Sequence, residues 1–100
     1  MTQGVPVYQF NRGLTTVQQA FHEWTTEIEP RDNEHGALWR PNQATRQWHS
    51  RRKKIMDFVK QIAIQESIPI EQAVDRVEQQ RKELHKSLDG LSKWLTKRNE

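Results

Sequence analysis

Residues 42–65 read NQATRQWHSRRKKIMDFVKQIAIQ, and this stretch decides the fold. Its apolar side chains recur at helical spacing and form a stripe about 100° wide, which is typical of an amphipathic helix. Asn42 directly follows Pro41 and is a suitable N-terminal cap. The members of the stripe are Ala44, Trp48, Ile55, Phe58, Val59 and Ile62. The pattern predicts one long helix from about residue 42 to 65, with one face packed on a core.

The same stretch carries the basic excess of the chain. Residues 41–60 contain six Lys and Arg against Asp57 alone, a net charge of +5, whereas residues 1–40 sum to −2 and residues 61–100 to zero. A charge imbalance confined to one helix is a local electrostatic footprint. The partner that it indicates is a polyanion.

The position of each basic residue around the helix separates two predicted roles. Side chains opposite the apolar stripe would meet base edges in a groove, and those on its borders would reach the phosphates. We predict as base-facing Arg46, His49, Ser50 and Lys53. We predict as phosphate contacts Arg12, Arg40, Arg51, Arg52, Lys54 and Lys60. The alternatives are a solvated face paired with acids elsewhere, a membrane surface or an acidic protein.

The remaining sequence predicts an extended arm over residues 1–14 and one helical domain over residues 15–98. Thr15 or Thr16 can form a capping box with a Gln three residues later, which starts a first helix that Pro30 should end. Residues 29–42 are polar and predict a connection. We expect Val5, Val7 and Phe10 of the arm to lie against the body.

A break at residues 67–71 predicts a third helix with Pro69 at its first helical position, and Ser87 should cap a separate last helix that ends near residue 97. The predicted fold is all-α with three or four helices, similar by analogy to a helix-turn-helix or Myb-like unit. We assign to the core Trp24, Trp39, Trp48, Ile55 and Val59.

The apolar spacing from residue 70 to 95 allows an alternative function. It could form a coiled-coil seam for a dimer or a partner helix, although Arg81 and Gly90 interrupt it. Packing of this stripe inside a monomer is the other interpretation, and we expect a monomer. An RNA-binding helical domain is a third possibility, without the aromatic sheet signature of the commonest RNA-binding fold.

The sequence contains no arrangement of residues that indicates catalysis. The chain has no Cys, no nucleophile beside a base and no Gly-rich phosphate loop, so we predict neither an enzyme nor a cofactor. Its four His share no ligand spacing, so no metal site is expected. No apolar run approaches the ~20 residues of a membrane span, which predicts a soluble protein.

The order of several motifs resembles the C-terminal DNA-binding domain of the yeast transcriptional activators of glycolytic genes, a domain also found in osmostress and filamentous-growth regulators. The resemblance covers about residues 8–96. It rests on Tyr8, Arg12, Thr16-Val17, Glu23-Trp24, Trp39-Arg40, Ser50-Arg51-Arg52-Lys53-Lys54-Ile55, Leu88 and Leu91. The family usually has a short helix within 29–38, where this chain is more polar, so the state of residues 31–36 stays open.

This resemblance implies a sequence-specific, double-stranded DNA-binding domain from a longer nuclear activator, reading a CTTCC-type promoter box. It also implies that contacts with other transcription factors lie outside this fragment.

Overall fold

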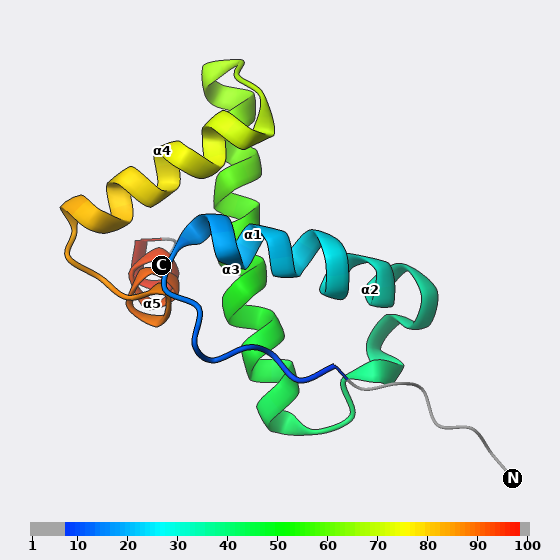
Figure 1. The fold of residues 1–100 in the computed structure, drawn as a ribbon. Helices are drawn as coiled ribbons and strands as arrows, with labels where there is room; N and C mark the ends of the chain where they lie inside the picture. The colour runs from blue at the N-terminus through cyan, green and yellow to red at the C-terminus, as the bar shows by residue number, and fades with distance from the viewer. Residues whose placement is uncertain (1–7, 99–100) are drawn as a thin grey trace, which may run out of the picture.

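The computed structural model describes residues 8–98, and within them the chain forms helices and no strand (Figure 1). The predicted all-α class is therefore confirmed, whereas the analogy with a helix-turn-helix or Myb-like unit is not. The helices are α1 (Val17–Glu23), α2 (Glu29–His35), α3 (Gln43–Glu66), α4 (Ile70–Glu83) and α5 (Leu88–Arg98).

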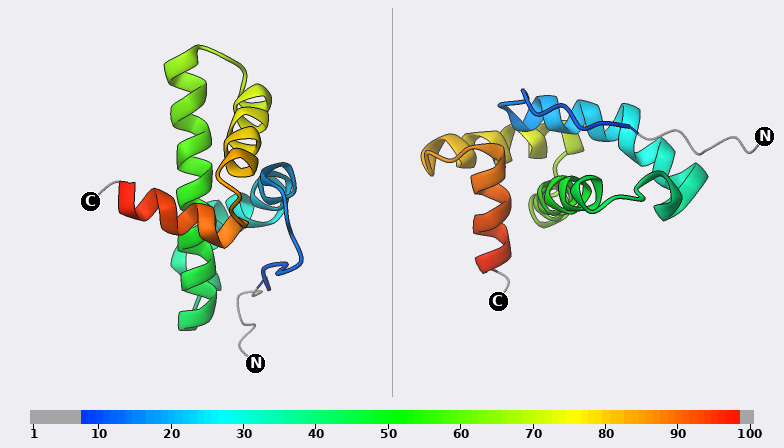
Figure 2. Two further views of the ribbon diagram at one scale, coloured as in Figure 1. Left: turned by 90° about the vertical axis from the view of Figure 1, so that its left-hand side faces the viewer. Right: turned by 90° about the horizontal axis from the view of Figure 1, so that it is seen from below.

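The long helix α3 is the centre of the fold. The Asn42 side chain caps it by accepting a hydrogen bond from the Thr45 amide at 2.8 Å, and Ser67 ends it in a left-handed conformation. These ends confirm the predicted helix. Helices α1 and α4 pack along one side of α3, and α5 crosses it (Figure 2). The largest fully buried side chains are Trp39, Ile28, Ile55, Met56, Leu91, Val17, Val59 and Val77.

Helix α1 begins as predicted with a capping box. The Thr16 hydroxyl accepts from the Gln19 amide at 3.2 Å, and the Gln19 side chain accepts from the Thr16 amide at 3.2 Å. Two amides that lack helical partners are satisfied reciprocally in this way.

The predicted stop at Pro30 is wrong, as is the predicted connection where it covers residues 29–35. The π-helical segment Trp24–Ile28 joins α1 to α2, with the Glu29 amide bonding the Trp24 carbonyl five residues back. The wider turn places Pro30 in the first turn of α2, a position that tolerates proline. Thr25 and Thr26 hydroxyls bond the carbonyls of Phe21 and His22. A nearly continuous helical rod results (Figure 1).

The apolar stripe from residue 70 to 95 is used inside the monomer. The turn between α4 and α5 divides it, with His85 in a left-handed conformation, and the Ser87 hydroxyl accepts from the Gly90 amide at 3.0 Å to cap α5. The separate last helix is thus confirmed. Of the apolar residues of the stripe, Val74, Val77, Leu88, Leu91 and Leu95 are buried and Ile70 and Leu84 are partly buried. Little of the stripe is therefore left for a partner helix.

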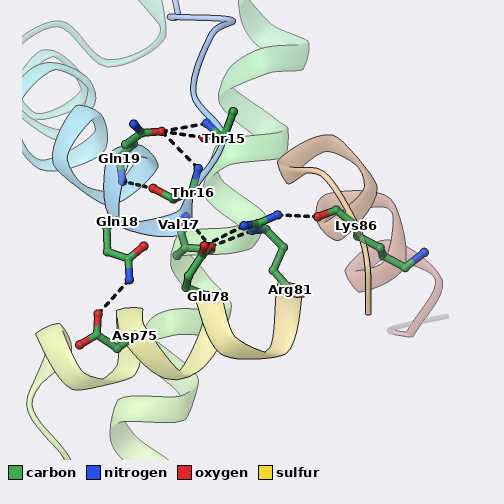
Figure 3. A network of polar contacts seen from close by, with 9 residues as sticks. All are labelled: Thr15, Thr16, Val17, Gln18, Gln19, Asp75, Glu78, Arg81 and Lys86. Carbon is green, nitrogen blue, oxygen red and sulfur yellow. Dashed lines mark hydrogen bonds and ion pairs between the residues drawn. The ribbon is translucent and has the colours of Figure 1, made fainter. Parts of the chain in front are cut away.

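Arg81, the charged interruption of that stripe, belongs to a polar network that joins three elements (Figure 3). Its guanidinium donates two bonds of 2.7 Å to Glu78 and one of 2.8 Å to the Lys86 carbonyl in the turn before α5. Glu78 also accepts from the Val17 amide at 3.0 Å. The network fixes the start of α1 on α4 and the direction in which α5 leaves.

We expect this network to make stability depend on pH. Hydrogen bonding to Arg81 lowers the pKa of Glu78, more than burial raises it, and the Val17 amide lowers it further. A carboxyl whose folded pKa is depressed stabilises the fold above its unfolded pKa, near 4.3, and loses that contribution as pH falls through the folded value. The free energy of unfolding, measured by urea titration from pH 7 to pH 3, should fall more steeply for the wild type than for Glu78→Gln. Parallel curves would contradict the assignment.

Candidate nucleic-acid interface

A row of exposed polar side chains runs along the side of α3 that faces away from α1 and α4. Arg46, Ser50, Lys53 and Asp57 lie at helical spacing on this row, and all are exposed. Arg46 forms no ion pair within residues 8–98, and Lys53 pairs only with Asp57, at 2.9 Å. Both partners of that pair are more than half exposed, so it contributes little and its ammonium can exchange partners. The row therefore offers a guanidinium, a hydroxyl and an ammonium to an approaching ligand.

Further basic residues lie on the flanks of this row or, for Arg12, on the arm beside Trp48. Arg51 lies 3.5 Å from Asp89, and the Lys54 ammonium donates to the Thr96 hydroxyl at 2.7 Å, so both contact α5. Arg40 lies 3.4 Å from Asp32, Lys60 is exposed beyond the row, and Arg12 is exposed on the arm. Of the predicted phosphate contacts, these five keep some surface exposure.

His49 does not point outward, and its predicted place on the open face is wrong. The residue is 7% exposed, and its Nε2 lies 2.7 Å from an Asp32 carboxylate oxygen. The rings of Trp24 and Trp39 lie against it, at centroid distances of 5.2 and 5.9 Å. Because α2 continues past Pro30, Asp32 is carried over α3 and covers this position. His49 thus positions α3 against α2.

Arg52 is also buried, and its predicted place at the surface is wrong. Its side chain is 3% exposed, faces the Glu23 carboxylate at 3.6 Å and donates to the Asn11 carbonyl at 3.2 Å. Burial lowers the pKa of Arg52, and the charge of Glu23 opposes this shift. A guanidinium stays protonated in proteins, so the pair is a buried ion pair. Arg52 in this position cannot reach a phosphate.

The buried pair also attaches the arm to the body. The Tyr8 hydroxyl and the Asn11 amide each donate to the Glu23 carboxylate at 2.8 Å. Burial, this hydrogen bond and the Glu23 charge raise the pKa of Tyr8 to about 12. Phe10 is buried as predicted, whereas Val5 and Val7 lie outside the described residues. Arg12 is thereby held beside α3.

Trp48 is not part of the core, contrary to the prediction. It is partly buried, and the guanidinium carbons of Arg12, Arg51 and Arg52 lie 5.6, 5.4 and 5.3 Å from its ring centroid. Ala44, one turn earlier on the stripe, is exposed. On the side of Trp48, the first turns of α3 extend past α1 and α4 (Figure 1), and Arg12 of the arm lies over them. The other predicted core residues, Trp24, Trp39, Ile55 and Val59, are buried.

Sequence reasoning missed Glu23 and Asp32, the two acids that hold Arg52 and His49. Neither is near its partner in the sequence, and Asp32 lies in a segment expected to be a loop. A local sequence signal for a buried ion pair exists only at Arg81, a charged residue on an apolar stripe. Its acidic partner is Glu78, three residues earlier.

The described residues give no sign of a metal centre or a membrane span. No group of three His, Asp or Glu side chains within residues 8–98 is arranged to hold a metal ion. None of the described helices has the length and apolarity needed to cross a bilayer.

Comparison with known proteins gives one family. Residues 8–81, which include the arm from Tyr8 onward, α1 to α3 and most of α4, match the family described as transcriptional activator of glycolytic enzymes. The comparisons with curated proteins and with solved structures gave no match. The matched residues span well over half of the chain. They contain the basic helix α3 and both acids that hold it, Asp32 and Glu23. The chain therefore belongs to the family of transcriptional activators of glycolytic enzymes.

Proposed function

We propose that this chain is the sequence-specific, double-stranded DNA-binding domain of a fungal transcription activator, with α3 in the major groove. The observation that supports this most is the exposed row Arg46, Ser50 and Lys53 on a helix of 24 residues. The major groove of B-DNA admits one α-helix. The row presents hydrogen-bond donors along one side of α3, which is what reading base edges requires.

The flanking bases would bind the backbone on either side of this groove. Arg12, Arg40, Arg51, Lys54 and Lys60 are the proposed phosphate contacts. His49 and Arg52 act indirectly, because their buried pairs with Asp32 and Glu23 hold α3 and the arm in place. Trp48 keeps the guanidinium of Arg12 close to that of Arg51. Affinity and base preference would thus depend on different side chains of the same helix.

The resemblance to glycolytic activators makes a CTTCC-type box the proposed target. The complementary strand of such a box contains two adjacent guanines. Arg46 suits one of them, because a planar guanidinium can donate to guanine O6 and N7 together. As part of an activator, the domain would act in the nucleus, beside transcription factors that bind outside this fragment.

Removal of a base contact should change preference at one position. Arg46→Ala is expected to cost about 1–3 kcal/mol of binding free energy and to relax selectivity at one base pair, because a bidentate contact is lost. Competition binding against a library of single-base-pair substitutions measures both quantities. Uniform weakening across the library, with selectivity unchanged, would refute the base-facing role. Lys53→Ala should relax a neighbouring position.

Removal of a phosphate contact should act on all sequences alike. Arg51 shares an exposed pair with Asp89 and can turn to a phosphate at little cost. Arg51→Ala should lower the slope of log K against log salt by about 1, with base preference retained. Titrations of one duplex between low and moderate salt give the slope. A selective loss at one base pair with an unchanged slope would show that Arg51 reads sequence instead.

A further inference from the structure

Helix α5 lies beyond the residues that match the family, yet its C-terminal end projects beside the open face of α3. Both views in Figure 2 show α5 crossing α3 and extending past it, on the side away from α1 and α4. The exposed row of α3 lies on this same side, because the buried residues of α3 face α1 and α4. The two helices thus form two sides of a corner.

The charges of α5 are distributed unevenly along its length. Asp89, its one acid, stands in the first turn and lies 3.5 Å from Arg51. Lys93, Lys97 and Arg98 follow, all exposed and with no ion pair within residues 8–98. Basic residues in the last turn of a helix also interact favourably with the helix dipole. This explains why they occur at the end of α5, but it does not explain why that end lies beside α3.

Contacts at the corner fix where these bases lie. The Arg98 guanidinium lies 5.3 Å from the ring centroids of both Phe58 and Trp94, which holds it against α3. The Lys54 ammonium bonds the Thr96 hydroxyl at 2.7 Å. A hollow between the helices is lined by Lys54, Asp57, Phe58, Gln61, Leu95 and Arg98. The negative charge of Asp57 would repel an anion in this hollow. The Lys53 ammonium lies 2.9 Å from the Asp57 carboxylate and offsets that charge.

From this arrangement we propose that the end of α5 is a second DNA-contact element, with Lys97 and Arg98 binding the phosphate backbone beside the groove that α3 enters. The inference rests on the proposed function of α3. A duplex seated on the exposed row would place one of its phosphate strands along the projecting end of α5. Lys93 lies one turn back on the same helix, away from the projecting end, and contributes less.

The network of Figure 3 makes this position reproducible. The bond from Arg81 to the Lys86 carbonyl holds the turn from which α5 starts, and the buried residues Leu88, Leu91 and Leu95 seat α5 on α3. The basic end of α5 is thus carried on a packed helix rather than on a free tail, which reduces the ordering cost of binding.

The test compares Lys97→Gln/Arg98→Gln with Lys82→Gln/Lys86→Gln, which removes the same charge from the α4–α5 turn, away from the projecting end. With one duplex and several salt concentrations, the first variant should lower the slope of log K against log salt by about 2 and weaken binding roughly tenfold or more. Base preference should be retained. The control variant should change the slope and the affinity by no more than about half as much as the first variant does. Circular dichroism checks that both variants keep their helices.

The outcomes separate the two proposals. Equal slopes and affinities for both variants, with wild-type DNA binding intact and sensitive to Arg46→Ala, would overturn the role of α5 alone. A folded wild-type chain that binds no duplex would overturn the proposed function and this inference together. A hydroxyl-radical footprint adds a second readout: the Lys97→Gln/Arg98→Gln variant should lose backbone protection on one flank of the site. An unchanged footprint would also count against α5.

Discussion

Arg52→Ala is expected to lower the free energy of unfolding by about 3–5 kcal/mol, because removing one partner of a buried ion pair leaves the other charge uncompensated. The Glu23 carboxylate, 5% exposed, would then keep only the hydrogen bonds from Tyr8 and Asn11. Small domains have a total stability of about 5–15 kcal/mol, so this loss is a large share. Urea unfolding followed by Trp fluorescence measures it.

Two further variants test the reason for this loss. Arg51→Ala removes the same charge from the preceding position, where the side chain is 36% exposed. It should lower the free energy of unfolding by less than about 1 kcal/mol. The double variant Glu23→Gln/Arg52→Met removes both charges and should recover part of the stability lost in Arg52→Ala. If Arg52→Ala and Arg51→Ala are equally stable, the buried pair does not hold the fold as described.

Trp39→Ala is expected to destabilise the domain by about 3–5 kcal/mol, the usual cost of deleting a buried Trp. Trp39 is fully buried beside Phe10 and His49, and its indole N–H donates to Asp32 at 2.8 Å. The variant loses the packing of the indole and also one partner of the acid that holds His49. Thermal or urea unfolding gives the change.

Trp48→Ala is the matched comparison, because the residue type is the same and only its burial differs. Trp48 is partly buried, and the guanidinium groups of Arg12, Arg51 and Arg52 lie over its ring. We expect this variant to fold with at most about 2 kcal/mol of destabilisation. It should lose DNA affinity, because Arg12 and Arg51 lose their common platform. Destabilisation as large as that of Trp39→Ala would return Trp48 to the core.

The elements that the sequence predicted well are those with local signals. The start of α1 at Thr16 and the cap at Asn42 each depend on side chains within four residues of the backbone groups they satisfy. The break before α4 depends on Pro69 itself, whose ring restricts the local backbone. Periodicity likewise identified the face of α3 that carries Ile55 and Val59. Local chemistry and helical period act without knowledge of the tertiary fold, which is why these predictions succeeded.

The predictions that failed required knowledge of what lies across from a residue. Pro30 is a strong local stop signal, but a π-helical turn moves it to a position where it is tolerated. That one difference brings α2 over His49. Arg52 looked like a surface base because its partner Glu23 is 29 positions earlier. Trp48 looked like core because periodicity cannot show that arginine side chains, rather than an apolar helix face, lie against its ring.

These corrections narrow the candidate interface. Three of the six basic residues between residues 46 and 60, Arg51, Arg52 and Lys53, already have acidic partners, and only the pair of Arg52 is buried. Base reading is therefore expected from a short row, Arg46, Ser50 and Lys53, and backbone binding from the arm, the flanks of α3 and the end of α5. A basic tetrad that suggests only general affinity in the sequence thus separates into residues with distinct roles.

Selection of duplexes from a random pool at one fixed salt concentration shows whether α3 reads DNA sequence. We expect the wild-type domain to enrich one short motif. A variant carrying both Arg46→Ala and Lys53→Ala, shown to be folded by circular dichroism, should enrich it far less. A folded wild-type domain that enriches no motif, or a double variant that enriches the same motif as strongly, would contradict the claim that α3 reads DNA sequence.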